Sequence, residues 1–430
     1  MALKAFLEQN LHQQIEPWPP TAWDFDKLAL AAFYYHPSIE VARAQWAVAR
    51  GGEITAGQRP NPTLNLLPGY SSTTSIPSPW LPFTWIDIPI ETAGKRSRRR
   101  AQAAQLSEAA RLNISTAAWQ VRSALRASLV DLSLTGQKLA LLQKQLSIQL
   151  EIAEVLEQQV AAGAISRSEE LPYRIALQRT RLDLADAERL HTESRNRTAA
   201  AIGVPLAALE QVKLSFDWQT VSSGAELASA EIRRAALQSR PEILSSLADY
   251  AASEAALRLQ IAKQYPDLRL QPGYQYDEGD SKWSLGLVFD LPLLNQNQGP
   301  IAEAQARRQE AAARFNALQA KVLAELELAV ATLKSTQKNA AGFGALAAEQ
   351  TKRRDSVKAQ FQAGAADRLE VLNAELESAT AQQVLLDGQT KLQQARGALE
   401  DAVQRPVFGS NASAPDPDST LLEIHPISAK

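Results

Sequence analysis

The side chains that most often do chemistry in proteins are sparse in this chain of 430 residues. There are four histidines and no cysteine. The histidines stand at His12, His36, His191 and His425, far from the spacing of a metal site. No nucleophile elbow, phosphate loop or usable pair of catalytic carboxylates is visible. We therefore expect a protein that is not an enzyme and has no metal site and no cofactor.

A run of basic residues is the most concentrated charge in the sequence. It contains Lys95, Arg96, Arg98, Arg99 and Arg100. A net charge of −2 gives no overall attraction to nucleic acid, and no aromatic residues interleave with the run, so we expect no nucleic-acid partner. Two interpretations remain open: contact with lipid phosphates at a membrane rim, or a solvated helix face.

Aromatic residues lie near the ends of two predicted β-hairpins, at residues 62–91 and 266–293. From Trp283 to Leu293, apolar residues alternate with others, which is typical of a strand with one apolar face. An interfacial aromatic girdle would have this placement, and so would hairpins that pack on a soluble domain. The proposed girdle residues are Tyr70, Trp80, Trp85, Tyr274 and Trp283.

Long helices follow each hairpin. Residues 95–162 contain no proline, and apolar or small residues recur there at coiled-coil spacing. We expect two long helical pairs, at 95–202 and 299–404. The fold class is therefore mainly α, with a β portion of four strands.

The chain contains an internal duplication. A displacement of about 204 positions brings Pro37 onto Pro241, Gly69 onto Gly273 and Tyr70 onto Tyr274. We divide the chain into an N-terminal extension (1–25), a first repeat (26–205), a linker (206–229), a second repeat (230–406) and a disordered C-terminal tail (407–430).

Four strands are too few to close a barrel, which needs about eight. Because the predicted hairpins would expose an apolar face and open edges, we expect several copies of the chain to complete the sheet together.

The order of these features resembles the TolC-like outer-membrane efflux proteins, in particular their cobalt–zinc–cadmium efflux branch. The resemblance covers about residues 26–406 and includes the segments Asn61-Pro62-Thr63-Leu64, Tyr265-Pro266-Asp267-Leu268 and Leu369-Glu370-Val371-Leu372. It implies a homotrimer with a twelve-stranded transmembrane β-barrel in lipid of the cell outer membrane and a coiled-coil tunnel that extends into the periplasm. It also implies a periplasmic adaptor protein and an inner-membrane RND-type pump as partners, with passive passage of substrates, heavy-metal cations among them.

The resemblance also implies functional residues at two helix–helix turns. Contact with the adaptor is expected at Gly163, Ala164, Arg167, Ser168, Gly364, Asp367 and Arg368. A periplasmic gate is expected at Glu370 and Asn373, with Glu169 as the equivalent of Glu370 in the first repeat. The alternative is that these are ordinary turn residues and a solvated helix face.

One observation favours a different function. Residues 1–10 show no signal-peptide pattern, so export would need a signal that is absent from the sequence considered. A soluble coiled-coil adaptor or scaffold protein would explain the helices and the missing signal, but it would not explain the duplicated hairpins.

Overall fold

The computed structural model describes residues 2–75, 77–210, 212–216 and 229–407. These residues form ten helices and four strands, which confirms the predicted mainly α fold class with a β portion. The chain divides into two compact units built from interleaved segments. The sheet unit comprises Val41–Ile114 and Pro241–Ala320; the helical unit comprises the remaining described residues.

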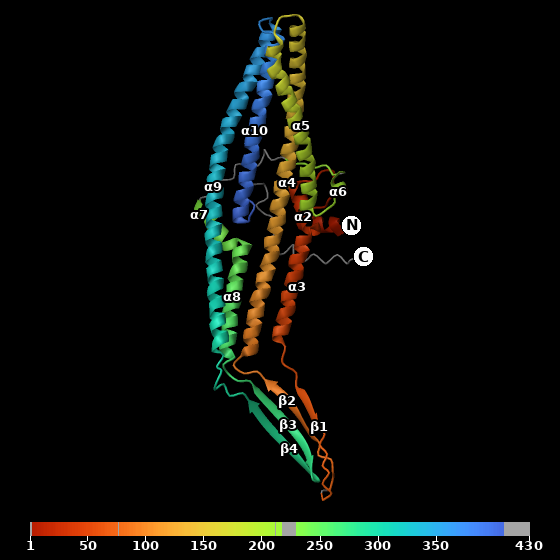
Figure 1. The fold of residues 1–430 in the computed structure, drawn as a ribbon, viewed down its shortest axis with the longest axis vertical. Coiled ribbons are helices and arrows are strands. Elements are labelled where there is room, and N and C mark those ends of the chain that lie inside the picture. Colours follow the sequence, from red (N-terminus) through yellow and green to blue (C-terminus); the bar gives the residue numbers. More distant parts are fainter. Residues whose placement is uncertain (1, 76, 211, 217–228, 408–430) are drawn as a thin grey trace. The chain divides into compact units, whose positions relative to one another are not determined.

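The sheet unit contains one antiparallel sheet with the strand order β1-β2-β3-β4. All four strands are joined to helices at the same end of this sheet (Figure 1). The strands are β1 (Thr63–Leu67), β2 (Phe83–Ile90), β3 (Leu268–Asp277) and β4 (Asp280–Phe289), and the helices joined to them are α3 (Pro37–Gly57), α4 (Lys95–Ala161), α8 (Pro241–Ala262) and α9 (Gln298–Gln362).

A tight turn closes the second hairpin. Asp277 pairs with Asp280, and the two residues between them, Glu278 and Gly279, have φ values of 51° and 102°. Two consecutive positive φ values define the turn that matches the right-handed twist of paired strands. This turn sets the register that opposes Tyr274 to Trp283.

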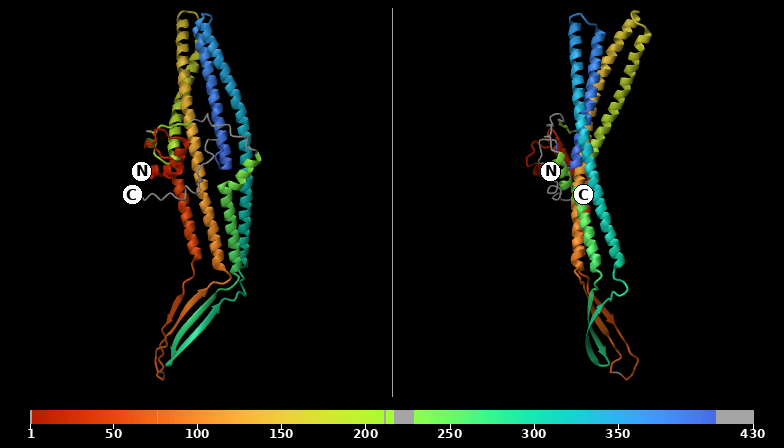
Figure 2. Two further views of the ribbon diagram at one scale, coloured as in Figure 1. Left: turned by 180° about the vertical axis from the view of Figure 1, so that it is seen from behind. Right: turned by 90° about the vertical axis from the view of Figure 1, so that its left-hand side faces the viewer.

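The helical unit is built around two helical hairpins, seen from three directions in Figures 1 and 2. One joins α4 to α5 (Arg167–Ile202), and the other joins α9 to α10 (Arg368–Val403). Helix α4 also packs on α10 through a buried cluster, in which Ile152 is 1% exposed and Leu372 is fully buried. Burial of one such side chain contributes about 1.5–3 kcal/mol, so this cluster is a major support for the ends of both hairpins.

The predicted N-terminal extension contains a helix. Helix α1 (Ala2–Leu11) packs against α2 (Phe25–Tyr35), where the rings of Phe6 and Tyr34 lie 5.5 Å apart. The short helix α6 (Leu206–Glu210) forms the first five residues of the predicted linker, and α7 (Ser229–Ser239) begins at its last residue. Apart from residue 407, the tail that we predict to be disordered lies outside the described residues.

The fourth strand is shorter than its alternating pattern predicts. Pairing ends where Leu268 faces Phe289, and β3 offers no partner to residues 290–293. Pro292 also has no N–H to donate, so the alternation continues past the end of the sheet. No helix in the described part of the chain is both long enough and apolar enough to cross a membrane.

Candidate functional site

One face of the sheet is apolar and open to solvent. The register aligns Leu66, Thr84, Tyr274 and Trp283 in one row across the four strands. On β4, Trp283 is 82% exposed and Leu285 is 71% exposed. Further exposed members of this face are Leu64, Ile86, Ile90, Leu287 and Phe289. An apolar face of this extent requires a covering of lipid or protein.

Four of the five proposed girdle residues lie in two aromatic pairs. Tyr70 and Trp80 form an antiparallel bridge beyond the strand ends, with ring centroids 5.3 Å apart. The rings of Tyr274 and Trp283 lie 4.9 Å apart within the sheet. These pairs can present large apolar surfaces with polar tips, which is the chemistry of an interfacial belt.

The prediction fails for Trp85, which lies on the opposite face of the sheet. It opposes Asn65 and Gly273, one position out of phase with Thr84 in the apolar row. Its ring stacks on Phe83 at 4.8 Å. Because neighbouring residues in a strand point to opposite faces, Trp85 cannot belong to the same girdle as Trp283.

Polar residues dominate the face on which Trp85 lies. Arg269 on β3 pairs with Asp87 on β2 at 3.3 Å, and Lys282 pairs with Asp277 at 2.7 Å. Glutamine and serine side chains occupy other positions of this face, including Gln271, Gln275 and Ser284. Such a face can remain hydrated while the other face is covered.

Most of the basic run at the start of α4 is engaged within the protein. Lys95 is 7% exposed and donates to the carbonyl of Tyr265 and to Asp267 Oδ1, both at 2.7 Å. Arg99 forms a two-pronged ion pair with Glu91.

The remaining arginines of the run differ from one another. Arg96 Nε donates to the carbonyl of Gly57 at 2.6 Å. The side chains of Arg98 and Arg100 form no hydrogen bond or ion pair with other described residues. The proposed contact with lipid phosphates therefore narrows from the whole run to these two residues and the free edge of Arg96.

Asp267 closes the joint between the sheet and α4. Burial opposes ionisation of its carboxyl, but hydrogen bonds from Lys95 and Thr92 outweigh this effect and lower its pKa below the usual value. A depressed carboxyl pKa contributes stability at neutral pH that is lost as the pH falls through the pKa of the folded state. The sequence offers no sign of this pairing, because the partners lie 172 residues apart.

The two helix–helix turns share one backbone geometry. Gly163 and Gly364 have φ values of 72° and 78°, in the left-handed region that favours glycine. In each turn the following alanine donates its N–H five residues back, Ala164 to Gln159 and Ala365 to Gln360. Glycine therefore ends the first helix of each hairpin and turns the chain toward the second.

The proposed gate residues begin the second helix of each hairpin. Glu370 is exposed, and its Oε2 accepts the N–H of Asp367 at 3.0 Å, while Asp367 Oδ1 accepts the N–H of Glu370 at 2.7 Å. This reciprocal pair is a capping box. In the other turn, Ser166 Oγ donates to Glu169 Oε1 at 3.0 Å. Asn373 is half-buried one turn into α10.

The proposed adaptor-contact residues lie at the surface, and one of them, Arg368, also forms an ion pair. Gly163, Ala164, Arg167 and Ser168 are exposed. Arg368 donates to Glu151 on α4 at 2.5 Å, a cross-link between the two hairpins that the sequence does not reveal. Both side chains of this pair are 49% exposed, so we expect it to contribute no more than about 1 kcal/mol.

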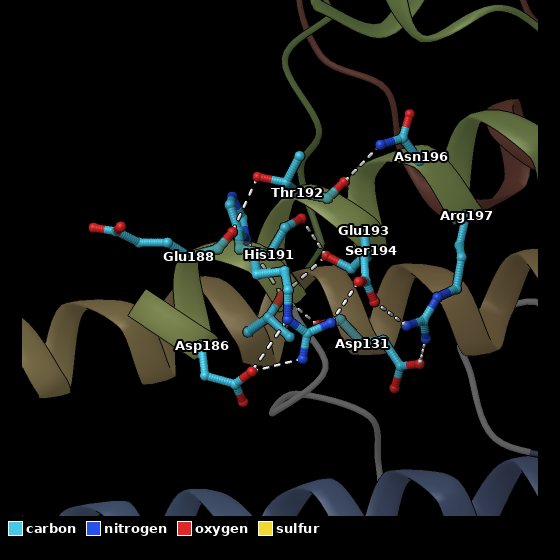
Figure 3. A network of polar contacts seen from close by, with 11 residues as sticks. Asp131, Asp186, Glu188, His191, Thr192, Glu193, Ser194, Asn196 and Arg197 are labelled. Atoms are coloured by element: carbon cyan, nitrogen blue, oxygen red, sulfur yellow. Dashed lines mark hydrogen bonds and ion pairs between the residues drawn. The ribbon is translucent and has the colours of Figure 1, made fainter. Parts of the chain in front are cut away.

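A polar layer joins α4 to α5 farther along the first hairpin (Figure 3). Thr135 lies 3.2 Å from His191 Nδ1 and 3.0 Å from Ser194 Oγ. Arg197 bridges Glu193 and Asp131 in the same region. His191 is thus half-buried within a helix interface. Across the described ranges, no three His, Cys, Asp or Glu side chains converge as metal ligands.

The comparisons with known proteins agree with this geometry. The family described as outer membrane efflux protein matches residues 232–403. The cobalt-zinc-cadmium resistance protein CzcC of Cupriavidus metallidurans is 24% identical over 269 residues, and the match spans 62% of this chain and 62% of that relative's length.

Solved structures share the fold at low sequence identity. The outer-membrane channel OprN has a TM-score of 0.74 and 16% identity, with coverage of 88% of this chain and 89% of that one. The outer membrane protein VceC of Vibrio cholerae has a TM-score of 0.70 and 18% identity, with coverage of 88% and 95%. CzcC is named as a resistance protein and OprN as an outer-membrane channel, in agreement with the prediction that this chain is not an enzyme.

The predicted resemblance is therefore confirmed: residues 232–403 match the outer membrane efflux protein family, and the chain shares the fold of the TolC-like outer-membrane channels.

Proposed function

We propose that three copies of this chain form the outer-membrane channel of a tripartite efflux system, which conducts substrates passively to the outside. The observation that carries this proposal is the four-stranded sheet, with its exposed apolar face and two open edges. The family and the shared fold support the same function.

The sheet of one chain provides one third of the strands of the proposed twelve-stranded barrel. Strands β1 and β4 are the edges of the sheet, and their outer sides are unpaired within the chain. Three copies paired edge to edge would supply twelve strands, enough to close a barrel without free edges. The apolar face would then meet lipid, and the face with Asp87, Arg269 and Trp85 would line the lumen.

The turns of the two helical hairpins are the proposed docking surface for a periplasmic adaptor. Their exposed polar residues and rigid glycine turns offer a defined shape to a partner. The adaptor would link the channel to an inner-membrane pump of the RND type, which would supply the energy for transport.

Glu370 and Glu169 are the proposed acidic groups of the tunnel entrance. In a trimer, three copies of each would form rings that attract cations, as acidic rings do in other cation channels. Asn373, one turn inward, would add a neutral ring. CzcC is named for cobalt, zinc and cadmium resistance, and it supports divalent metal cations as the cargo.

Transport can be tested with the full-length protein expressed with an export signal and reconstituted in liposomes that contain a zinc-responsive dye. We expect external zinc to enter and to raise the dye signal far faster than in empty liposomes. A dye signal equal to that of empty liposomes, together with no conductance steps in planar bilayers, would refute the channel. If choline and zinc enter at equal rates, the channel would stand but the metal preference would not.

A further inference from the structure

We propose that a groove between the end of α3 and the start of α4 binds the phosphate of an anionic phospholipid. The groove has a volume of about 740 Å³, and its lining includes Arg96, Ser97, Arg100, Gln58 and Glu53. This inference rests on the proposed function only for its location at an outer membrane. It adds a defined lipid site to the general contact with lipid.

The donors of the groove are arranged to grip one anion. Arg96 and Arg100 lie four residues apart on α4, and so on one side of the helix. The bond from Arg96 Nε to the Gly57 carbonyl fixes that guanidinium while its terminal nitrogens remain available to a ligand. Two guanidinium groups, each with parallel N–H donors, match the oxygens of a phosphate diester.

Gly57 makes room for the second arginine. A Cβ at this position would lie 3.7 Å from Arg100 Cδ, so the stem of Arg100 runs directly alongside the glycine. This contact directs the arginine along the groove between the two helices. A larger residue at position 57 would compete with the ligand for the same space.

The composition of the lining favours a lipid over a free phosphate ion. Glu53 is the single acid among the lining residues, so two guanidinium groups leave a positive excess. Ile54, which is 71% exposed, joins Ala101 and Ala104 as an apolar wall. A free phosphate gains nothing from contact with an apolar wall, whereas the glycerol and first methylenes of a lipid can pack against it.

The groove lies beside the end of the sheet's apolar face. Helix α3 ends at Gly57, shortly before β1, and α4 begins at Lys95, shortly after β2. The ion pair between Arg99 and Glu91 ties the start of α4 to the chain that leaves β2. Headgroups occupy about 5–8 Å on each side of a bilayer core, so a groove next to the last apolar row is placed to meet them.

The test uses full-length protein that has been extracted from membranes into detergent and stripped of bound lipid. Phosphatidylglycerol is added back, and native mass spectrometry counts the lipids retained per chain. We expect Arg100→Gln to lower retention at least tenfold. We expect Ala101→Phe, which fills the groove without a change in charge, to have a similar effect. Arg59→Gln is the matched control, with the same charge loss at an exposed arginine just outside the lining, and should stay within twofold of the wild type.

Three results would overturn the proposal. Wild-type retention in both Arg100→Gln and Ala101→Phe would remove the site. An equal loss in Arg59→Gln and Arg100→Gln would indicate diffuse attraction to anionic lipid. Displacement of the lipid by millimolar inorganic phosphate would identify a free-anion site. The assay requires no conductance, so failure of the channel function would be seen separately.

Discussion

The carboxylate of Glu370 has two separable roles, and two substitutions distinguish them. It caps α10 through Asp367, and in the proposed trimer it places a negative charge at the tunnel entrance. Glu370→Gln keeps a side-chain oxygen that can accept the N–H of Asp367, so the capping box survives without the charge. Asp367→Ala removes one half of the cap, at a cost of about 0.5–2 kcal/mol, and leaves the Glu370 charge in place.

The size of the charge effect follows from Coulomb's law. Three unit charges about 10 Å from a permeating cation stabilise it by roughly 1.2 kcal/mol in unscreened water, which corresponds to about an eightfold enrichment. At 0.15 M salt the Debye length is about 8 Å, and screening reduces the enrichment to about twofold. The preference for cations should therefore weaken as salt is added.

Reversal potentials in planar bilayers under a potassium chloride gradient measure this preference. We expect Glu370→Gln to lower the ratio of cation to anion permeability by about twofold at 0.15 M salt and by more at lower salt. Asp367→Ala should keep the wild-type ratio despite its weaker cap. If the ratio is unchanged in Glu370→Gln and falls in Asp367→Ala, the helix cap and not the charge controls the entrance, and the gate assignment is wrong.

Three further predictions concern the sheet, its junction with α4 and the end of α5. Leu285→Arg places a charge on the apolar face, where it costs about 2–4 kcal/mol in a bilayer, so the outer-membrane fraction should lose the protein; Gln271→Arg, on the opposite face, should insert normally. Asp267→Asn removes the charge that pairs with buried Lys95 and should lower trimer stability by up to about 1 kcal/mol at pH 7, since the pair is partly exposed. Heated gels should show this difference begin to shrink only below about pH 4, where wild-type Asp267 becomes protonated at its lowered pKa, and a difference that does not shrink there would contradict the pairing. Gly203→Ala must force a side chain onto backbone only 2.9 Å away at φ of 85°, so we expect a loss of roughly 1–3 kcal/mol in thermal unfolding, and no loss would contradict the described packing.

Much of the fold could be predicted because its signals are local. The absence of proline and the heptad spacing predicted a helix at residues 95–162, and α4 runs from Lys95 to Ala161. Glycine at positions 163 and 364 predicted turns with positive φ, as observed. Alternation placed β4 but not its end, because the end depends on where its partner strand begins.

The parts that could not be predicted depend on distant partners. The coiled-coil spacing on α4 suggested one seam, yet beyond Leu142 the buried positions also include Ile148 and Ile152, which lie off that seam and face α10. A helix that packs against two neighbours needs two apolar stripes, and spacing alone does not say which neighbour each stripe meets. In the same way, aromatic content placed Trp85 near a strand end, while only the register shows its face.

The mass and location of the assembled particle test the central claim most directly. Full-length protein expressed with an export signal is extracted from separated membranes, and light scattering measures the protein mass within the detergent particle. A particle from the outer-membrane fraction with about three times the chain mass of 46.9 kDa is the result that we predict. A monomer or dimer that remains in solution without detergent would contradict the channel and would favour a soluble coiled-coil scaffold.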